Sequence, residues 1–363
     1  MKHDAVIDTL PIYVVSESAK LGYREKETWM KLDWNESPNN ASQNVIRAIN
    51  KFLEEHSLSY YPDVTSNDLI LALSERYKVP KTFLSVFNGS DNALQHIFYT
   101  FLSENSIFAT LQPTYTQILQ FVNFKRARIN YHLPDDVLNV DYSKYEKECI
   151  SGADVVYLIN PHNPTGHLLT RDYIGQLAKN NPDTLFVIDE AYMEFASSDE
   201  SCIPLVTEQK NIIVTRTFSK AYGLAGIRLG FAVSHNENID LIQRIKNNKD
   251  INTLAQIAGE AAVKDSAYLD NHIKDILQTR KWFIENVPDK YSVVDSEANF
   301  VLVNYEKDPE LIERLKVNRV LVRDRSDQHG LRNFLRITVG TRKQMEAVVA
   351  VMSGLQEISS AAT

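Results

Sequence analysis

Three short clusters of polar residues carry side chains that could do chemistry, and each directly follows an apolar run. They are NPHNPTG at residues 160–166, DEAY at residues 189–192 and TFSKAYGLAGIRLG at residues 217–230. They supply an amide, a carboxylate, a phenol, a lysine and an arginine, namely Asn163, Asp189, Tyr192, Lys220 and Arg228. A lysine amine can condense with a carbonyl and a carboxylate can hold a nearby cation, so this set suits covalent catalysis at an aldehyde.

Pyridoxal phosphate is a cofactor that needs this combination of groups. Its aldehyde forms a Schiff base with a lysine, and its ring nitrogen stays protonated beside a carboxylate. We therefore expect Lys220 to carry the Schiff base and Asp189 to hold the protonated ring nitrogen. Asn163 and Tyr192 can both donate to the phenolate oxygen of the cofactor. These four residues are the predicted catalytic set.

The phosphate of such a cofactor needs hydroxyls, backbone N–H groups and a cation. Ser219 and Arg228 supply a hydroxyl and a cation, and NGSDN at residues 88–92 begins a helical run whose first N–H groups favour a dianion. Each residue alone also has an ordinary explanation, since single lysines are mostly solvated and Asn-Pro or Asp can serve turns and helix caps. Their shared position after successive strands favours the cofactor site.

The three clusters must be positioned by a sheet. Between about residues 85 and 235, short apolar runs alternate with helical stretches, and the expected strands are 106–110, 154–160, 185–189, 211–216 and 230–234. Runs such as VVYLIN and LFVID are apolar on both faces, as in a strand covered by helices on each side. This pattern predicts an α/β fold with a mostly parallel central sheet and helices on both faces. Ligands of such sheets bind beyond the carboxyl ends of the strands, where the three clusters lie.

A second pattern follows residue 235. We expect long amphipathic helices at 238–248, 253–264 and 268–286, then strands at 291–294, 300–304, 320–323 and 334–339, and a last helix at 343–355. This pattern predicts a smaller α+β domain. The predicted division is an N-terminal arm at 1–40, a large cofactor-binding domain at 41–245 and a small C-terminal domain at 246–363.

The composition excludes several classes of protein. The 363 residues are 44% hydrophobic and 24% charged, which is ordinary for a folded globular chain. A net charge of -8 argues against a nucleic-acid partner. Cys149 and Cys202 are too few for a disulfide framework and form no zinc pattern, so no metal site is expected. Without a signal pattern or an apolar stretch of membrane-spanning length, we expect a cytoplasmic protein with no membrane partner.

The motifs together resemble those of fold-type I pyridoxal phosphate enzymes of the aminotransferase superfamily, and they look most like the histidinol-phosphate aminotransferase branch. The resemblance covers nearly the whole chain. Its motifs are YPD at 61–63, NGSD at 88–91, PTY at 113–115, NPHNPTG at 160–166, DEAYMEF at 189–195, TFSKAYGLAGIRLG at 217–230, VRD at 322–324 and LRITVGT at 335–341. The Ser-Lys segment with its downstream arginine is specific for the superfamily, whereas DEAYMEF and LRITVGT point to the branch.

The resemblance implies the same roles for the catalytic set and adds further cofactor contacts. Around the phosphate these are Ser90, Asp91, Thr217, Ser219 and Arg228. The aromatic side chain implied to stack on the cofactor ring is that of Tyr115.

Other implied residues face the substrate or a second subunit. Tyr61 would reach the cofactor phosphate of a second subunit, which implies a homodimer with shared active sites. Arg336 resembles the arginine that binds the anionic group of the substrate, and Arg323 looks like a second anion contact. For Arg323 the alternative is a surface ion pair with Asp324 or Asp327.

This sequence departs from the pattern of that branch at three places. Asn92 stands where an acidic residue usually follows GSD, Ile118 stands where an aromatic residue often follows PTY, and NESPNN at 35–40 replaces a glycine-containing segment. We expect none of them to touch the cofactor. We expect Ile118 and the altered segment to lie where the substrate is recognised.

The expected activity is a ping-pong transamination. The expected pair is a phosphorylated amine or amino alcohol, histidinol phosphate first, with 2-oxoglutarate as the acceptor. Two alternatives on the same scaffold stay open. One is an aminotransferase for an aromatic amino acid or a small phosphorylated amine, and the other is a decarboxylase of a phosphorylated amino acid that uses the same cofactor.

Two other classes of protein fit the sequence less well. A nicotinamide dehydrogenase needs G-x-G-x-x-G after an early strand, but Gly223, Gly226 and Gly230 are spaced differently and lie late in the chain. A non-enzymatic binding module has no use for a Schiff-base lysine paired with an electron-sink acid, so Lys220 and Asp189 argue against it.

Overall fold

The central feature of the computed structural model, which describes residues 6–10 and 17–355, is a seven-stranded sheet. Its strands run in the order β2 (Leu84–Phe87), β8 (Gly230–Ser234), β7 (Ile212–Thr217), β6 (Leu185–Asp189), β5 (Val155–Ile159), β3 (Ile107–Leu111) and β4 (Arg128–His132). Only β8 is antiparallel to its neighbours, so the sheet is mostly parallel as predicted.

Helices cover both faces of this sheet, which explains why its middle strands are apolar throughout. All five residues of β5 are buried. Val155, Tyr157 and Ile159 pack in one core with α6 (Ser90–Phe101), α7 (Gln117–Phe124) and α10 (Asn236–Gln243). Val156 and Leu158 face the opposite core, which includes α9 (Arg171–Asn180). The predicted α/β fold class is confirmed.

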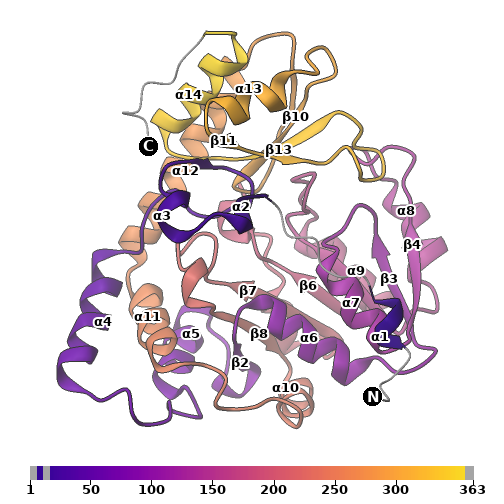
Figure 1. The fold of residues 1–363 in the computed structure, drawn as a ribbon. Coiled ribbons are helices and arrows are strands. Elements are labelled where there is room, and N and C mark those ends of the chain that lie inside the picture. Colours follow the sequence, from indigo (N-terminus) through magenta and orange to yellow (C-terminus); the bar gives the residue numbers. More distant parts are fainter. Residues whose placement is uncertain (1–5, 11–16, 356–363) are drawn as a thin grey trace.

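A second, four-stranded sheet lies above the first in Figure 1. It is antiparallel, in the order β12 (Arg323–Asp324), β13 (Phe334–Thr338), β10 (Phe300–Asn304) and β9 (Ser292–Val294). The helices nearby are α12 (Ser266–Asn286), α13 (Leu311–Val317) and α14 (Arg342–Met352). α14 begins with a capping box, in which Thr341 and Gln344 satisfy each other's backbone N–H groups. The smaller α+β unit predicted from the sequence is present.

The N-terminal segment bridges the two sheets. Within it, β1 (Met30–Lys31) pairs in parallel with β11 (Val320–Leu321) of the smaller unit. The short helices α2 (Glu17–Lys20) and α3 (Tyr23–Lys26) lie between the two units, and α1 (Val6–Thr9) lies beside α7 (Figure 1). Residues 1–5 and 11–16 of the predicted arm lie outside the described residues.

One helix beyond the predicted boundary at residue 245 packs on the larger unit. This helix, α11 (Thr253–Lys264), packs on α4 (Gln43–Glu55) and α5 (Asn67–Tyr77), and α12 then runs from it toward α14 (Figure 1). The division at residues 40 and 245 stays a prediction.

The remaining short elements are α8 (Tyr142–Tyr145), η1 (Lys81–Phe83), η2 (Glu146–Ile150), η3 (Met193–Phe195), η4 (Ile203–Thr207) and η5 (Ala225–Ile227).

Among the described residues, none of the helices is both long enough and apolar enough to cross a membrane. Both cysteines, Cys149 and Cys202, are buried and unbonded to each other.

Candidate active site

A cavity of about 860 Å³ opens at the carboxyl ends of β5, β6 and β7. Its walls come from the larger unit, the smaller unit and the N-terminal segment around Asp33 and Asn35. Twelve of the predicted site residues line it, namely Ser90, Asp91, Tyr115, Asn163, Asp189, Tyr192, Thr217, Ser219, Lys220, Arg228, Arg323 and Arg336. The structure therefore brings together side chains that are as far as 246 positions apart in the sequence, from Ser90 to Arg336.

Asp189, the last residue of β6, lies on the cavity side of the sheet. Its carboxylate accepts hydrogen bonds from Tyr157 Oη at 2.8 Å and Thr215 Oγ1 at 3.2 Å. Burial raises the pKa of Asp189 to about 6, although these two hydrogen bonds act in the opposite direction. A buried carboxylate is electrostatically suited to hold a protonated ring nitrogen.

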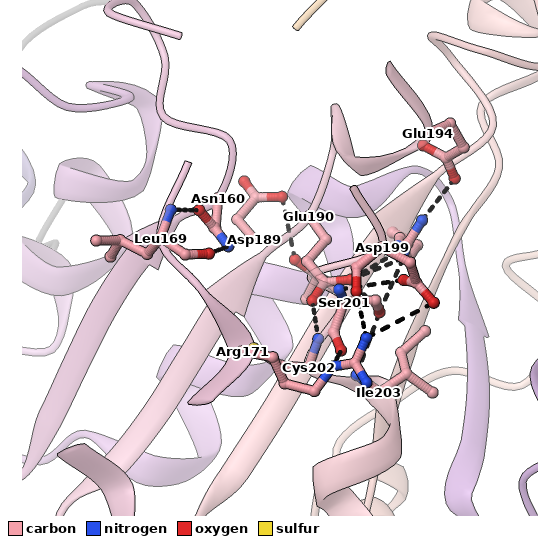
Figure 2. Close-up of polar contacts among 12 residues, drawn as sticks. Asn160, Leu169, Arg171, Asp189, Glu190, Glu194, Asp199, Ser201, Cys202 and Ile203 are labelled. Carbon is pink, nitrogen blue, oxygen red and sulfur yellow. Dashed lines mark hydrogen bonds and ion pairs between the residues drawn. The ribbon is translucent and has the colours of Figure 1, made fainter. Parts of the chain in front are cut away.

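Glu190, the next residue, points to the other side of the sheet because side chains alternate along a strand. There its carboxylate accepts hydrogen bonds from Arg216 Nε at 2.9 Å and Ser201 Oγ at 2.8 Å, and from the backbone N–H of Cys202. Arg216 also pairs with Glu194 at 2.8 Å. Burial opposes the charge of Arg216, but the two carboxylates raise its pKa. Figure 2 shows this buried network, which holds the chain directly after Asp189.

The side chains of Lys220 and Tyr192 lie close together in the cavity. Lys220 Nζ lies 5.8 Å from the centre of the Tyr192 ring and donates a hydrogen bond to the backbone carbonyl of Trp34 at 2.8 Å. Tyr192 Oη accepts hydrogen bonds from Asn35 Nδ2 at 3.0 Å and from Asn163 Nδ2 at 3.4 Å. The N-terminal segment is thus in direct contact with the predicted catalytic set.

The predicted phosphate contacts gather at the start of α6. Arg228 Nη1 donates to Ser219 Oγ at 3.4 Å, and Arg228 Nη2 lies 3.5 Å from a carboxylate oxygen of Asp91. The Arg228 backbone has a φ of 58°, a left-handed conformation that is uncommon for a residue with a side chain. A Cβ at Gly89 would lie 2.4 Å from Arg228 Nη2, so glycine is what allows the guanidinium to approach the helix N-terminus.

Around this guanidinium, other donors face the same part of the cavity. Thr217 Oγ1 accepts the backbone N–H of Ser219 at 3.1 Å, and Tyr115 Oη donates to Asp91 at 3.0 Å. The first residues of α6 add backbone N–H groups, which have no partner within the helix. Two hydroxyls, a guanidinium and a helix N-terminus form a donor set that fits a phosphate dianion.

Arg336 and Arg323 lie at the opposite end of the cavity, on the smaller unit. Arg336 is buried, and its guanidinium donates to Asn163 Oδ1 and to the backbone carbonyl of Asp33, both at 2.7 Å. Arg323 pairs directly opposite Arg336 in the β12–β13 ladder. Asp324 was one of the two alternative ion-pair partners of Arg323. Its carboxylate accepts hydrogen bonds from the backbone N–H and the hydroxyl of Ser326, at 2.9 and 2.7 Å.

Tyr61 is the predicted site residue that the structure does not place in the cavity. It is 78% exposed and lines a separate hollow of about 520 Å³ between α4, α5 and α11. Lys249 Nζ lies 4.6 Å from the centre of its ring. Tyr61 is therefore exposed on the surface of the chain, away from the cavity.

The expectation that Ile118 lies where the substrate is recognised was wrong, whereas Asn35 and Glu36 of the altered segment do line the cavity. Ile118 is fully buried in the core between α6 and α7, and on α7 the side chains that line the cavity are Gln117, Gln120 and Phe121. The altered segment at 35–40 reaches the predicted catalytic set, since Asn35 donates to Tyr192. Asn35 itself is held by Thr338, whose hydroxyl accepts its backbone N–H at 3.0 Å.

Several functional contacts were missed from the sequence. Tyr157 and Thr215, which donate to Asp189, were not predicted. Tyr157 lies within an apolar strand and Thr215 follows an apolar run, and a single Tyr or Thr in such a place gives no signal of a functional contact. Trp34 contributes a backbone carbonyl, which has no sequence signature. Arg325 also lines the cavity. Its position two residues after Arg323 in a strand-like segment was the available signal.

This fold and this set of side chains define a pyridoxal phosphate-dependent transferase. Residues 27–352 match the family described as aminotransferase class I and II, and the chain belongs to that family. It is 35% identical over 326 residues to a dihydroxyacetone phosphate transaminase of Campylobacter jejuni, covering 88% of each chain. It is 34% identical over 337 residues to a histidinol-phosphate aminotransferase of Geotalea daltonii, covering 91% of this chain and 94% of the relative.

A solved structure gives the same result. The histidinol-phosphate aminotransferase of Sinorhizobium meliloti, in complex with pyridoxal-5'-phosphate, matches 98% of both chains with a TM-score of 0.85 and 25% identity. The protein is thus an aminotransferase that uses pyridoxal phosphate. The buried Asp189, the lysine and the phosphate-type donor set agree with that cofactor.

Proposed function

We propose that this aminotransferase exchanges an amino group between a phosphorylated amine, histidinol phosphate first, and 2-oxoglutarate. The observation that carries the proposal is the hydrogen bond from Arg336 to Asn163. It places a buried guanidinium against the same amide that lies beside Tyr192 and the reaction centre. An anionic substrate bound to Arg336 is therefore held next to the groups that do the chemistry.

The roles proposed for the cofactor-binding residues follow from their surroundings. Asp189 would hold the ring nitrogen, and Asn163 and Tyr192 would hold the phenolate oxygen. The phosphate would be held by Ser90, Asp91, Thr217, Ser219 and Arg228, and the ring by Tyr115. When bound, pyridoxal phosphate supplies a conjugated ring into which electrons from the substrate's α-carbon can move. Asp189 strengthens this effect because its negative charge keeps the ring nitrogen protonated.

Lys220 would do two tasks in turn. Its Nζ holds the aldehyde carbon of the cofactor until an amino substrate takes its place. The released Nζ would then remove the proton from the carbon that bears the substrate's amino group and deliver it to the carbon that was the aldehyde carbon of the cofactor. The carbonyl of Trp34, 2.8 Å from this nitrogen, keeps the amine directed into the cavity.

A ping-pong order fits the single cavity. The donor and the acceptor need the same lysine and the same arginine, so they bind one after the other. Arg336 would bind the phosphate of the amine in one half-reaction and a carboxylate of 2-oxoglutarate in the other, since its fork pairs two oxygens of either group. Arg323 would be the second contact with the anion.

A second amino substrate is favoured by the Campylobacter relative, which is named for dihydroxyacetone phosphate. Replacing the ketone of that compound by an amine gives an amino carbon next to a CH2–O–phosphate group. Histidinol phosphate has the same arrangement and differs in its other substituent, an imidazolylmethyl group in place of a hydroxymethyl group. Both substrates would place their phosphate at the same distance from the reacting carbon.

We also propose a homodimer in which Tyr61 contributes to the partner's cofactor site. Residues 53–71 carry a group of exposed large apolar side chains, including Leu58 at 59%, Tyr60 at 80% and Tyr61 at 78% exposure. Such a gathering is typical of a surface covered by another protein. A second copy of this chain is the proposed partner.

The test is to incubate the cofactor-loaded protein with each phosphorylated amine and 2-oxoglutarate and to measure glutamate formation. Glutamate from histidinol phosphate supports the first choice, and glutamate only from the amine of dihydroxyacetone phosphate supports the second. The decarboxylase alternative predicts carbon dioxide from a phosphorylated amino acid without any keto acid. That last result would contradict the proposal.

A further inference from the structure

We propose that Arg325 is a third arginine of the substrate's anion site and that it makes the site selective for a phosphate ester over a carboxylate. This inference rests on the proposed function, because it assigns a group that recognises the phosphate of the amino substrate.

The first argument is the backbone pairing that carries the three arginines. Arg323 lies opposite Arg336 in the β12–β13 ladder, and the pairing continues because the backbone N–H of Arg325 donates to Phe334 O at 2.9 Å. Side chains two residues apart on an extended strand point to the same face, so Arg325 lies on the same side as Arg323. All three side chains line the one cavity.

The second argument is the state of the Arg325 guanidinium. Its Nε is buried and makes no hydrogen bond to any of the residues that the structure describes. Burial, together with the charges of Arg336 and Arg323, lowers the pKa of Arg325 to about 8. Burial beside two like charges is unfavourable for a guanidinium, and a bound anion would relieve it.

In the part of the chain that the structure describes, the nearby acids are engaged elsewhere or exposed to solvent. The two acids of the N-terminal segment that line the cavity, Asp33 and Glu36, are both paired with Lys31. Asp324 is engaged by Ser326. Asp327 attracts Arg325 electrostatically but is exposed to solvent, which weakens the attraction.

The number of positive charges then identifies the ligand. A carboxylate has one negative charge and two oxygens, which one arginine fork satisfies. A phosphate monoester has close to two negative charges and three free oxygens. The fork of Arg336 suits one carboxylate, whereas Arg325 adds the further charge and donors that the second charge and third oxygen of a phosphate call for. The guanidinium of Arg325 therefore strengthens binding of the phosphorylated amine in one half-reaction and is not required for binding of the keto acid in the other.

The test is the substitution Arg325→Gln in the cofactor-loaded enzyme, with Arg332→Gln as the matched control, because Arg332 is an exposed arginine on the same connection. We expect KM for the phosphorylated amine to rise roughly tenfold or more, as for the loss of a charged hydrogen bond, while KM for 2-oxoglutarate stays unchanged. Inhibition by inorganic phosphate should weaken in parallel. Arg325→Lys should recover part of the loss, and an unchanged cofactor absorption band shows that each variant is folded.

Two contrary results have different meanings. If the wild-type enzyme transfers no amino group from any phosphorylated amine, the proposed function fails. If the wild-type enzyme does so but Arg325→Gln matches it, or weakens both substrates equally, the assignment of Arg325 alone is overturned.

Discussion

Arg323 and Arg336 stand directly opposite each other in the antiparallel pairing of β12 and β13. Like charges at facing positions of a sheet destabilise the pair. A bound anion, as proposed for this site, would offset the repulsion by attracting both guanidiniums. On the proposed function, this unfavourable pairing lies where the substrate would be recognised.

Arg336→Gln should weaken both half-reactions. The substitution removes the guanidinium that contacts Asn163 and the carbonyl of Asp33, and with it the fork proposed to bind both phosphate and carboxylate. We expect KM for the amine and for 2-oxoglutarate each to rise roughly tenfold to a hundredfold. Steady-state kinetics with each substrate varied in turn measures this. A variant with unchanged KM for both substrates would place the anion site elsewhere.

The affinity for pyridoxal phosphate should fall as the pH falls through about 6. Burial raises the pKa of Asp189 to about 6 in the protein alone, so below that pH its carboxyl group is protonated. A neutral carboxyl gives the protonated ring nitrogen no charge partner, and the affinity should drop by up to about tenfold per pH unit. Equilibrium dialysis between about pH 5 and 7 measures the slope.

Asp189→Asn is the control for this pH dependence. Its cofactor affinity should be low at every pH and should lack the part of the slope that comes from Asp189. The free energy of unfolding of the cofactor-free protein should depend on pH in the opposite sense. Folding raises the pKa of Asp189, so the contribution of this group to stability is lost as the pH rises from about 4 to 6. Equal slopes for the wild type and Asp189→Asn would contradict the assignment of Asp189.

Glu190→Gln should destabilise the fold strongly. It removes a buried carboxylate that accepts hydrogen bonds from Arg216, Ser201 and the backbone of Cys202, and leaves Arg216 with Glu194 as its charge partner. Breaking a buried ion pair typically costs about 3–5 kcal/mol of unfolding free energy. Urea unfolding of the cofactor-free protein measures it. Glu237→Gln, which breaks a surface pair with Lys210, is the control and should leave the transition unchanged.

Mixing two inactive variants should restore activity if Tyr61 acts in the site of a second subunit. Tyr61→Ala and Lys220→Ala chains, each alone, have every site defective. A mixed dimer has both defects in one site and none in the other, so random mixing should restore about a quarter of the wild-type sites. Activity is measured after the two variants are unfolded and refolded together. No recovery, with dimers demonstrably mixed, would show that Tyr61 does not cross the interface.

The sequence predicted the central strands because they are buried on both faces. β6 was predicted with its observed bounds, and β3, β5 and β7 to within one residue at each end. The edge strands β2 and β4 were not predicted, since β2 is only four residues long and β4 mixes exposed and half-buried positions. Their identity as strands depends on pairing with β8 and β3, which the local sequence does not encode.

The candidate site shows the same limit. Motif residues such as Asp189 and Lys220 follow strands, and the topology of a parallel sheet gathers them at one edge. Contacts that depend on chain segments far apart could not be predicted. Asn35 donates to Tyr192 while Thr338 of the smaller unit holds the Asn35 backbone. Ile118 lies on the face of its helix that packs in the core, so it does not reach the cavity.

The most direct test is a single half-reaction. The protein is loaded with pyridoxal phosphate, histidinol phosphate is added alone, and the visible absorption band of the bound cofactor is followed. We predict that the band disappears with one equivalent of keto product per site, returns when 2-oxoglutarate is added, and does not respond in the Lys220→Ala variant. A band that forms normally but is unchanged by histidinol phosphate and by every other phosphorylated amine, while it responds to unphosphorylated amino acids, would contradict the account.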